Sequence, residues 1–171
     1  MKEIIAKDGS TFFIRPITSE DKNLLIEGLD KLSEESKHHR FLGFKKAFTE
    51  KELKYLTELD GINQVGLALG FENEDSSVEG IGVARYHRLK DNYSRAEFAI
   101  TLLDNMQGKG LGTQLMLELI LNAKSNGVTH FEGLLETTNE QMIALVKKLE
   151  GFTFSNIGNG LLKIEGDLSS Y

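Results

Sequence analysis

The chain has 171 residues, 40% hydrophobic and 27% charged, a composition ordinary for a soluble globular domain with one well-buried core. Its net charge of −6 argues against a general nucleic-acid binder, because contacts to phosphates need a basic surface. The absence of cysteine excludes disulfides and thiolate metal sites, and the four histidines lack the spacing of a metal centre. We therefore expect a single domain over residues 1–171 that holds no metal.

The beginning of the chain gives no sign of export. The first ten residues, MKEIIAKDGS, lack the apolar core of a signal peptide, and no apolar run approaches the length of a membrane span. We therefore expect a cytoplasmic protein that has neither a membrane nor a nucleic acid as a partner.

The first predicted elements are a hairpin and a helix. Two β-rich runs within residues 4–17 are joined through Asp8 and Gly9, a dipeptide typical of hairpin turns. Thr18 then offers a helix N-cap, which predicts a helix over 20–33.

The next segment is basic. A short helix is expected within 33–44, and a second one, opened by a Thr-Glu capping pair, over 50–59. We expect three apolar residues to anchor the intervening loop: Phe41, Leu42 and Phe44. Positive charge gathers along this stretch, and we interpret it as a solvated helical face: Lys37, Arg40, Lys45, Lys46, Lys51 and Lys54, with His38 and His39.

The rest of the chain alternates strands and helices. The pattern predicts strands over 64–72, 78–89 and 94–103, a helix over 113–127, a strand over 128–136, a helix over 139–150, and strands over 152–157 and 161–168. An acidic turn, NEDSSVE, separates the first two of these strands. This order predicts an α/β (α+β) fold with a mixed, mostly antiparallel sheet.

A glycine-rich stretch, MQGKGLGTQL, lies between the third of these strands and the following helix. Alternating glycines leave the backbone N–H groups from Gly108 to Thr113 free of side-chain cover, and the helix dipole adds partial positive charge. These N–H groups, Leu111 included, can bind a phosphate-bearing ligand, and Lys109 could add charge beside it.

Two known phosphate-binding loops fit poorly. Nothing in the chain matches G-x-x-x-x-G-K-[ST], the P-loop pattern. A dinucleotide fingerprint would need a third glycine where Thr113 or Leu115 stands, although Glu132 lies about twenty residues on, where a ribose-binding acid belongs. A dinucleotide-binding domain remains an alternative, and it would predict affinity for NAD instead of coenzyme A.

A third pattern fits better. Gln107, Gly110 and Gly112 match the Q/R-x-x-G-x-G/A signature of the GNAT N-acetyltransferases. Four blocks in order, RPITSEDKNLL, SEESKHHRF, AEFAITLLDNMQGKGLGTQLM and NEQMIALVKKLEGF, resemble the acetyltransferase domain of bacterial Pat-type protein-lysine acetyltransferases. The resemblance implies a GNAT-like sheet flanked by helices, acetyl-CoA as co-substrate and an amine acceptor, with a protein lysine as the expected one.

The resemblance also implies roles for individual residues around acetyl-CoA. Gln107 and the following loop would hold its pyrophosphate. The free backbone of Ile100 and Leu102 would pair with the pantetheine arm. The N–H of Leu102 would lie where the thioester oxygen gains charge. Asn139 matches an asparagine that contacts pantetheine, and it is also a suitable helix N-cap.

Glu97 is the candidate catalytic base, because a lysine amine with a pKa near about 10.4 must lose a proton before it attacks. It is the one acid inside the apolar run AEFAITLL, where burial would raise its pKa, and it occupies the place of the catalytic glutamate in the Pat-like domains. Many GNAT enzymes carry a tyrosine that protonates the leaving thiolate at the position of Val146. The Pat-like domains tend to lack it too, so the proton donor is not identified.

Two further alternatives stay open. The acceptor could be a small polycationic amine attracted by an acidic cleft, for which the acids of NEDSSVE are available. The chain could also be a non-catalytic sensor of acyl-CoA, which would keep the glycine loop but need no base at Glu97. The sequence does not indicate the oligomeric state, the regulation or the acyl-chain preference.

Overall fold

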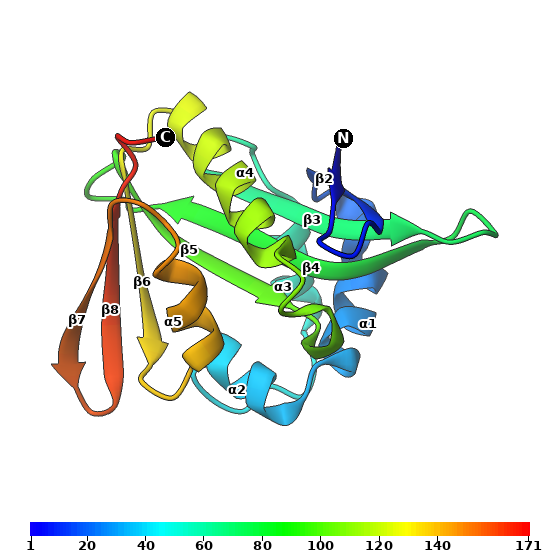
Figure 1. Ribbon diagram of the computed structural model, residues 1–171, viewed down its shortest axis with the longest axis horizontal. Helices are drawn as coiled ribbons and strands as arrows, with labels where there is room; N and C mark the ends of the chain where they lie inside the picture. The colour runs from blue at the N-terminus through cyan, green and yellow to red at the C-terminus, as the bar shows by residue number, and fades with distance from the viewer.

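A single eight-stranded sheet runs through the computed structural model, which describes residues 1–171 (Figure 1). The strands are β1 (Lys2–Ile5), β2 (Thr11–Pro16), β3 (Gln64–Glu72), β4 (Val78–Arg88), β5 (Arg95–Leu102), β6 (His130–Glu136), β7 (Phe152–Gly158) and β8 (Leu161–Asp167). The helices are α1 (Lys22–Lys31), α2 (Glu34–Phe41), α3 (Glu50–Thr57), α4 (Leu111–Ser125) and α5 (Glu140–Val146), with short 3-10 turns at Ser19–Asp21 and Asp104–Met106. The predicted mixed, mostly antiparallel α/β fold is confirmed.

The sheet order is β1-β2-β3-β4-β5-β6-β8-β7, and β5–β6 is the parallel pair. The buried side of α4 packs against the middle of the sheet on one face, while α1, α2 and α3 lie on the other (Figure 1). Six α4 side chains are fully buried in this core: Leu111, Leu115, Met116, Leu119, Ile120 and Ala123. Their helical spacing is the periodicity that predicts this helix.

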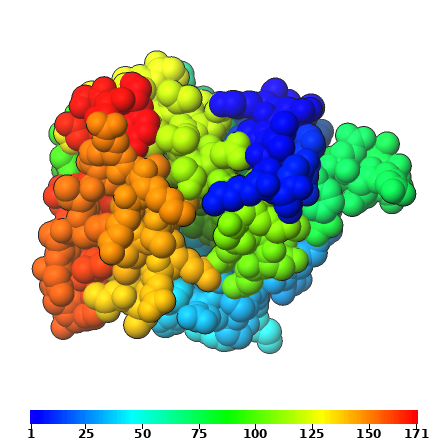
Figure 2. All heavy atoms as spheres, viewed as in Figure 1, coloured from blue at the N-terminus to red at the C-terminus, as the bar shows by residue number.

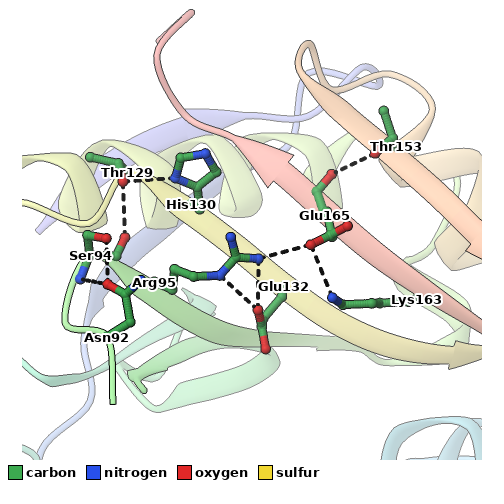
Figure 3. A network of polar contacts seen from close by, with 9 residues as sticks. All are labelled: Asn92, Ser94, Arg95, Thr129, His130, Glu132, Thr153, Lys163 and Glu165. Atoms are coloured by element: carbon green, nitrogen blue, oxygen red, sulfur yellow. Dashed lines mark hydrogen bonds and ion pairs between the residues drawn. The ribbon is translucent and has the colours of Figure 1, made fainter. Parts of the chain in front are cut away.

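The parallel pair β5–β6 is short. Register is kept only from Arg95 to Glu97, opposite His130 to Glu132, and beyond that point the two strands diverge (Figure 1). The paired end is fastened by Arg95, which donates to Glu132 at 2.9 and 3.1 Å and to Glu165 of β8 at 3.0 Å (Figure 3). These contacts hold β5 and β6 together at one end, and the two strands separate after Glu97 and Glu132.

Two details differ from the sequence-based prediction. Helix α5 ends at Val146 and not at residue 150, because the N–H groups of Lys148 and Leu149 bond three residues back and form a tighter turn that buries Leu149. Phe44 is 83% exposed and anchors nothing. Phe41, another of the expected anchors, does hold the loop, because its ring packs against that of Phe48 with centroids 5.9 Å apart.

The acidic turn between β3 and β4 lies at the tip of a hairpin that projects from the body of the molecule (Figure 2). Asp75 accepts hydrogen bonds from the N–H and hydroxyl groups of Ser77 within this turn, so its charge is satisfied locally. No helix combines the length and the apolar character that crossing a membrane would need.

Candidate functional site

The glycine loop connects β5 to α4 with two left-handed residues. Gly108 has φ 76° and Gly110 has φ 85°, a region that residues with a Cβ rarely adopt. Gly110 is the N-cap of α4, and no side chain caps this helix. None of the backbone N–H groups from Gly108 to Thr113 donates a hydrogen bond to another part of the chain. They therefore form a row of free donors at the positive end of a helix that is 15 residues long.

The N-terminal hairpin closes one side of this loop (Figure 2). The N–H of Lys7 donates to the carbonyl of Lys109 at 3.4 Å, and the side chain of Gln114 donates to the carbonyl of Ile5 at 3.0 Å. The ammonium of Lys109 lies 3.2 Å from Asp8. Hydrogen bonds from Ser10, with help from Lys109, lower the pKa of Asp8 to about 2. The charge of Lys109 is thus already paired.

The diverging edge of β5 leaves backbone groups free. The N–H of Leu103 donates to the carbonyl of Ile81 on β4 at 2.9 Å. Because alternate residues of an antiparallel strand face the same neighbour, Ile100 and Leu102 face the opposite edge, where β6 has moved away. The Gln107 side chain donates to the carbonyl of Leu102 at 3.2 Å and so ties the glycine loop to this edge, while its Oε1 is buried without a partner.

A cleft of about 560 Å³ lies between the diverging strands. Figure 2 shows part of this hollow between α5 and the start of α4. Its walls are β5 from Phe98 to Leu102, β6 from Gly133 to Leu135, and residues of α2 and α5. The loop residues Gln107, Gly108, Gly110, Gly112 and Thr113 line it, whereas Lys109 and Leu111 do not. The cleft thus joins the row of free N–H donors to the free edge of β5.

Helix α2 crosses the open end of the cleft and is tied to both diverging strands. On the β5 side, Asp104 accepts from Ser33 N–H at 3.0 Å, from its hydroxyl at 2.9 Å and from the Ser36 hydroxyl at 2.6 Å. On the β6 side, Glu136 lies 3.0 Å from His38 Nε2 and 3.8 Å from His39 Nε2. These ties place His39 and Ser36 in the cleft wall.

Helix α5 supplies the opposite wall. Asn139 lines the cleft, and its Oδ1 caps α5 by accepting from the N–H of Met142 at 3.0 Å. Its amide nitrogen makes no hydrogen bond to the chain, so the N-cap leaves a donor for a ligand. Val146 is fully buried and brings no hydroxyl to the site.

Glu97 is less buried than the sequence suggests. Its side chain is 55% exposed and lies 3.4 Å from Nε2 of His87 on β4. The expectation of burial is wrong because Glu97 alternates with Ala96 and Phe98, which fill the core, and so it points away from α4. It shares this face with Arg95, Ala99 and Thr101, the last two of which line the cleft.

Two arginines on this face were not identified from the sequence as site residues. Arg40 of α2 lines the cleft and is partly buried, so it departs from the predicted solvated face. Arg85 of β4 lies beside it, and its guanidinium donates to the carbonyl of Leu56 at 2.8 Å. Arg40 stands among five lysines and two histidines of one segment, and nothing local distinguishes it. The acids of the projecting turn, in contrast, do not line the cleft.

Comparisons with known proteins agree on one family. Residues 11–153 match the model of the family described as "Acetyltransferase (GNAT) domain". The chain is 30% identical over 135 residues to Acetyltransferase PA5475 of Pseudomonas aeruginosa, covering 79% of this chain and 72% of that protein. It is 31% identical over 143 residues to Acetyltransferase Pat of Mycolicibacterium smegmatis, covering 84% of this chain but only 42% of Pat. The GNAT domain of S. lividans PAT superposes with a TM-score of 0.87 at 26% identity, over 97% and 96% of the two chains.

Proposed function

Because this chain belongs to the GNAT family of acetyltransferases, we propose that its cleft binds acetyl-CoA and that residues 1–171 form one catalytic domain for transfer to a primary amine. The observation that carries this proposal is the row of free N–H groups from Gly108 to Thr113 at the mouth of the cleft. Such a row fits the pyrophosphate of a coenzyme, since it binds anions through the backbone alone. The family membership argues against the dinucleotide alternative, because the matched family is one of acetyltransferases.

Successive regions of the cleft match successive parts of acetyl-CoA. The loop would hold the pyrophosphate. The free backbone groups of Ile100 and Leu102 would form hydrogen bonds with the pantetheine arm, which would take the place of a neighbouring strand. Asn139, at the start of α5, lines the same channel. When bound, acetyl-CoA supplies an activated acetyl thioester. The N–H of Leu102, or that of Ile100 on the same edge, would stabilise the charge that develops on its oxygen.

Glu97 would act as the general base. It lies on the face opposite α4, where α2 and the cleft-lining residues Ala99 and Thr101 leave room for an acceptor. At about 3.3 Å per residue, its Cα lies roughly 16 Å along the strand from that of Leu102. An amine beside Leu102 is therefore too far away for direct contact with Glu97, and its proton would pass to the carboxylate along a chain of several waters.

A protein lysine is the acceptor that we propose. It would reach the cleft from the α2 face, where the exposed carboxylate of Glu97 attracts a cationic side chain. The resemblance to Pat-type enzymes supports the same choice. The chain spans 42% of the length of M. smegmatis Pat, so this substrate class is a proposal for the domain and not a property carried over from that protein.

Calorimetry and mass spectrometry test the two parts separately. Acetyl-CoA and CoA should bind with a stoichiometry of one and raise the melting temperature, by about 2.7 kcal/mol of stability at one hundred times Kd, whereas NAD should shift it far less. Equal shifts with NAD and CoA would contradict the coenzyme site. A mixed panel of proteins and polyamines, incubated with acetyl-CoA and analysed by mass spectrometry, should show acetylated lysines. Acetylated polyamines alone would contradict the protein acceptor.

A further inference from the structure

Two arginines share a small apolar cavity without an acidic partner. The cavity, of about 100 Å³, lies between α1, α2, the end of α3 and the sheet. Arg40 enters it from α2 and Arg85 from β4. No carboxylate lies within 4.0 Å of either guanidinium. Arg85 donates one hydrogen bond, to Leu56, while Arg40 has only the ring of Phe41 at 5.1 Å from its Cζ.

The acids nearby do not serve as counter-ions. Asp21 also lines the cavity, but it accepts from both guanidinium nitrogens of Arg15 at 2.6 and 2.8 Å and from the N–H of Thr18 at 2.7 Å. Glu97 attracts Arg40 from beyond contact distance, and its exposed carboxylate contacts His87. The two arginines therefore keep most of their donors free.

This arrangement costs free energy unless a ligand completes it. Burial and the charge of Arg40 lower the pKa of Arg85 to about 10, and burial also lowers that of Arg40. Two like charges that are side by side and partly shielded from water destabilise the folded chain. Their guanidinium forks match the geometry of a carboxylate, to which arginine donates two parallel hydrogen bonds.

The cavity opens from the acyl end of the cleft. Arg40 and Thr101 line both the cavity and the cleft. Arg85 is paired in register with Ala99, two residues from Thr101, on the face where the acceptor would enter. The remaining lining is mostly aliphatic and aromatic, so a short carbon chain would fit between the arginines and the cleft, whereas a nucleotide would not.

We propose that Arg40 and Arg85 bind a carboxylate group of a substrate. This inference rests on the proposed function, because it places the carboxylate either at the far end of the acyl chain carried by coenzyme A or on the acceptor. In the first case the domain transfers a dicarboxylic acyl group as well as acetyl. In the second the acceptor presents a carboxylate close to its amine.

Matched acyl-CoA probes identify the first source. Succinyl-CoA and butyryl-CoA have acyl chains of equal length and differ in a terminal carboxylate against a methyl group. Isothermal titration should give a Kd about 10- to 100-fold lower for succinyl-CoA, the range expected for charge-assisted hydrogen bonds. The preference should vanish in Arg85→Met and in Arg40→Met, and persist in Lys46→Met, which removes an exposed charge of the same basic segment.

Glutarate, titrated with and without saturating acetyl-CoA, identifies the second source. Saturable binding of glutarate that is lost in Arg85→Met, together with equal affinities for the two acyl-CoA probes, assigns the carboxylate to the acceptor. Equal affinities for the acyl-CoA probes and no glutarate binding would overturn the proposal. If coenzyme A itself fails to bind, the proposed function is wrong, while the titration without acetyl-CoA still tests the arginine pair.

Melting curves give a readout that does not depend on ligands. Replacing Arg40 or Arg85, which have no acidic partner, by methionine should leave the melting temperature unchanged or raise it, in contrast to the loss expected when a paired arginine is removed. A folded Arg85→Gln variant keeps the hydrogen bond to Leu56 within reach and serves if the methionine variant does not fold.

Discussion

The variant Gly110→Val distinguishes an effect on coenzyme binding from an effect on the stability of the fold. Gly110 has φ 85°, and a Cβ there would meet only the flexible side chain of Lys7, at 3.4 Å. Gly158, the last residue of β7, has φ 86° with nothing within 4 Å, so it is a matched control outside the cleft. Valine in the left-handed region costs about 1–2 kcal/mol, so both variants should lose a similar stability.

The two variants should differ in binding. At about 2–4 °C per kcal/mol for a chain of this size, each melting temperature should fall by roughly 2–8 °C. Only Gly110→Val moves the N–H row, and the loss of one charge-assisted hydrogen bond raises the Kd by about 10- to 100-fold. Isothermal titration with CoA measures this difference. A folded Gly110→Val protein with the wild-type Kd would refute the assignment of the loop, as would an equal loss in Gly158→Val.

Three further changes test other parts of the structure. Glu97→Gln should lower turnover by about 10²- to 10⁴-fold without changing the Kd of acetyl-CoA, and the defect should shrink as pH rises, because more of the amine is then neutral; a wild-type rate would remove Glu97 from the mechanism. The hydrogen bonds from Arg15 hold the pKa of Asp21 below its usual range, so the stability they provide is complete above about pH 4–5 and is lost as pH falls through the folded value. Asp21→Asn should therefore lower stability by about 1–3 kcal/mol at pH 7, and by less at pH 3, in urea titrations. Arg95→Met, which removes the partner of Glu132 and one of the two partners of Glu165, should cost about 0.5–1 kcal/mol in the same assay, and an unchanged urea midpoint would show that the network does not fasten the strands.

The elements that follow local rules were predictable. Thr49 and Glu52 form the expected capping box, with the Thr49 N–H 2.8 Å from the Glu52 carboxylate. The glycine loop was recognisable because Gly108 and Gly110 adopt positive φ, a requirement that only glycine meets freely. Both features depend on residues close together in the sequence, so they can be predicted without knowing how the rest of the chain folds.

The exposure of individual charged residues was not predictable. Glu97 lies in an apolar run, and whether it faces the core or the solvent depends on the register of β5 against β4 and α4. Strand alternation gives two faces but does not say which one the long helix covers. The same holds for Arg85, which alternates with the buried Ala84 and Tyr86 on β4.

Helix α2 explains why the basic segment was misjudged at Arg40. None of its residues is fully buried, so its position does not come from an apolar face packed on the core. It comes from polar ties to Asp104 and Glu136, which lie 71 and 98 residues from their partners in the sequence. Those ties span the two strands that diverge, so the helix that carries Arg40 also sets how far the mouth of the cleft opens. The charge of the segment and the shape of the acceptor entrance are thus properties of one element.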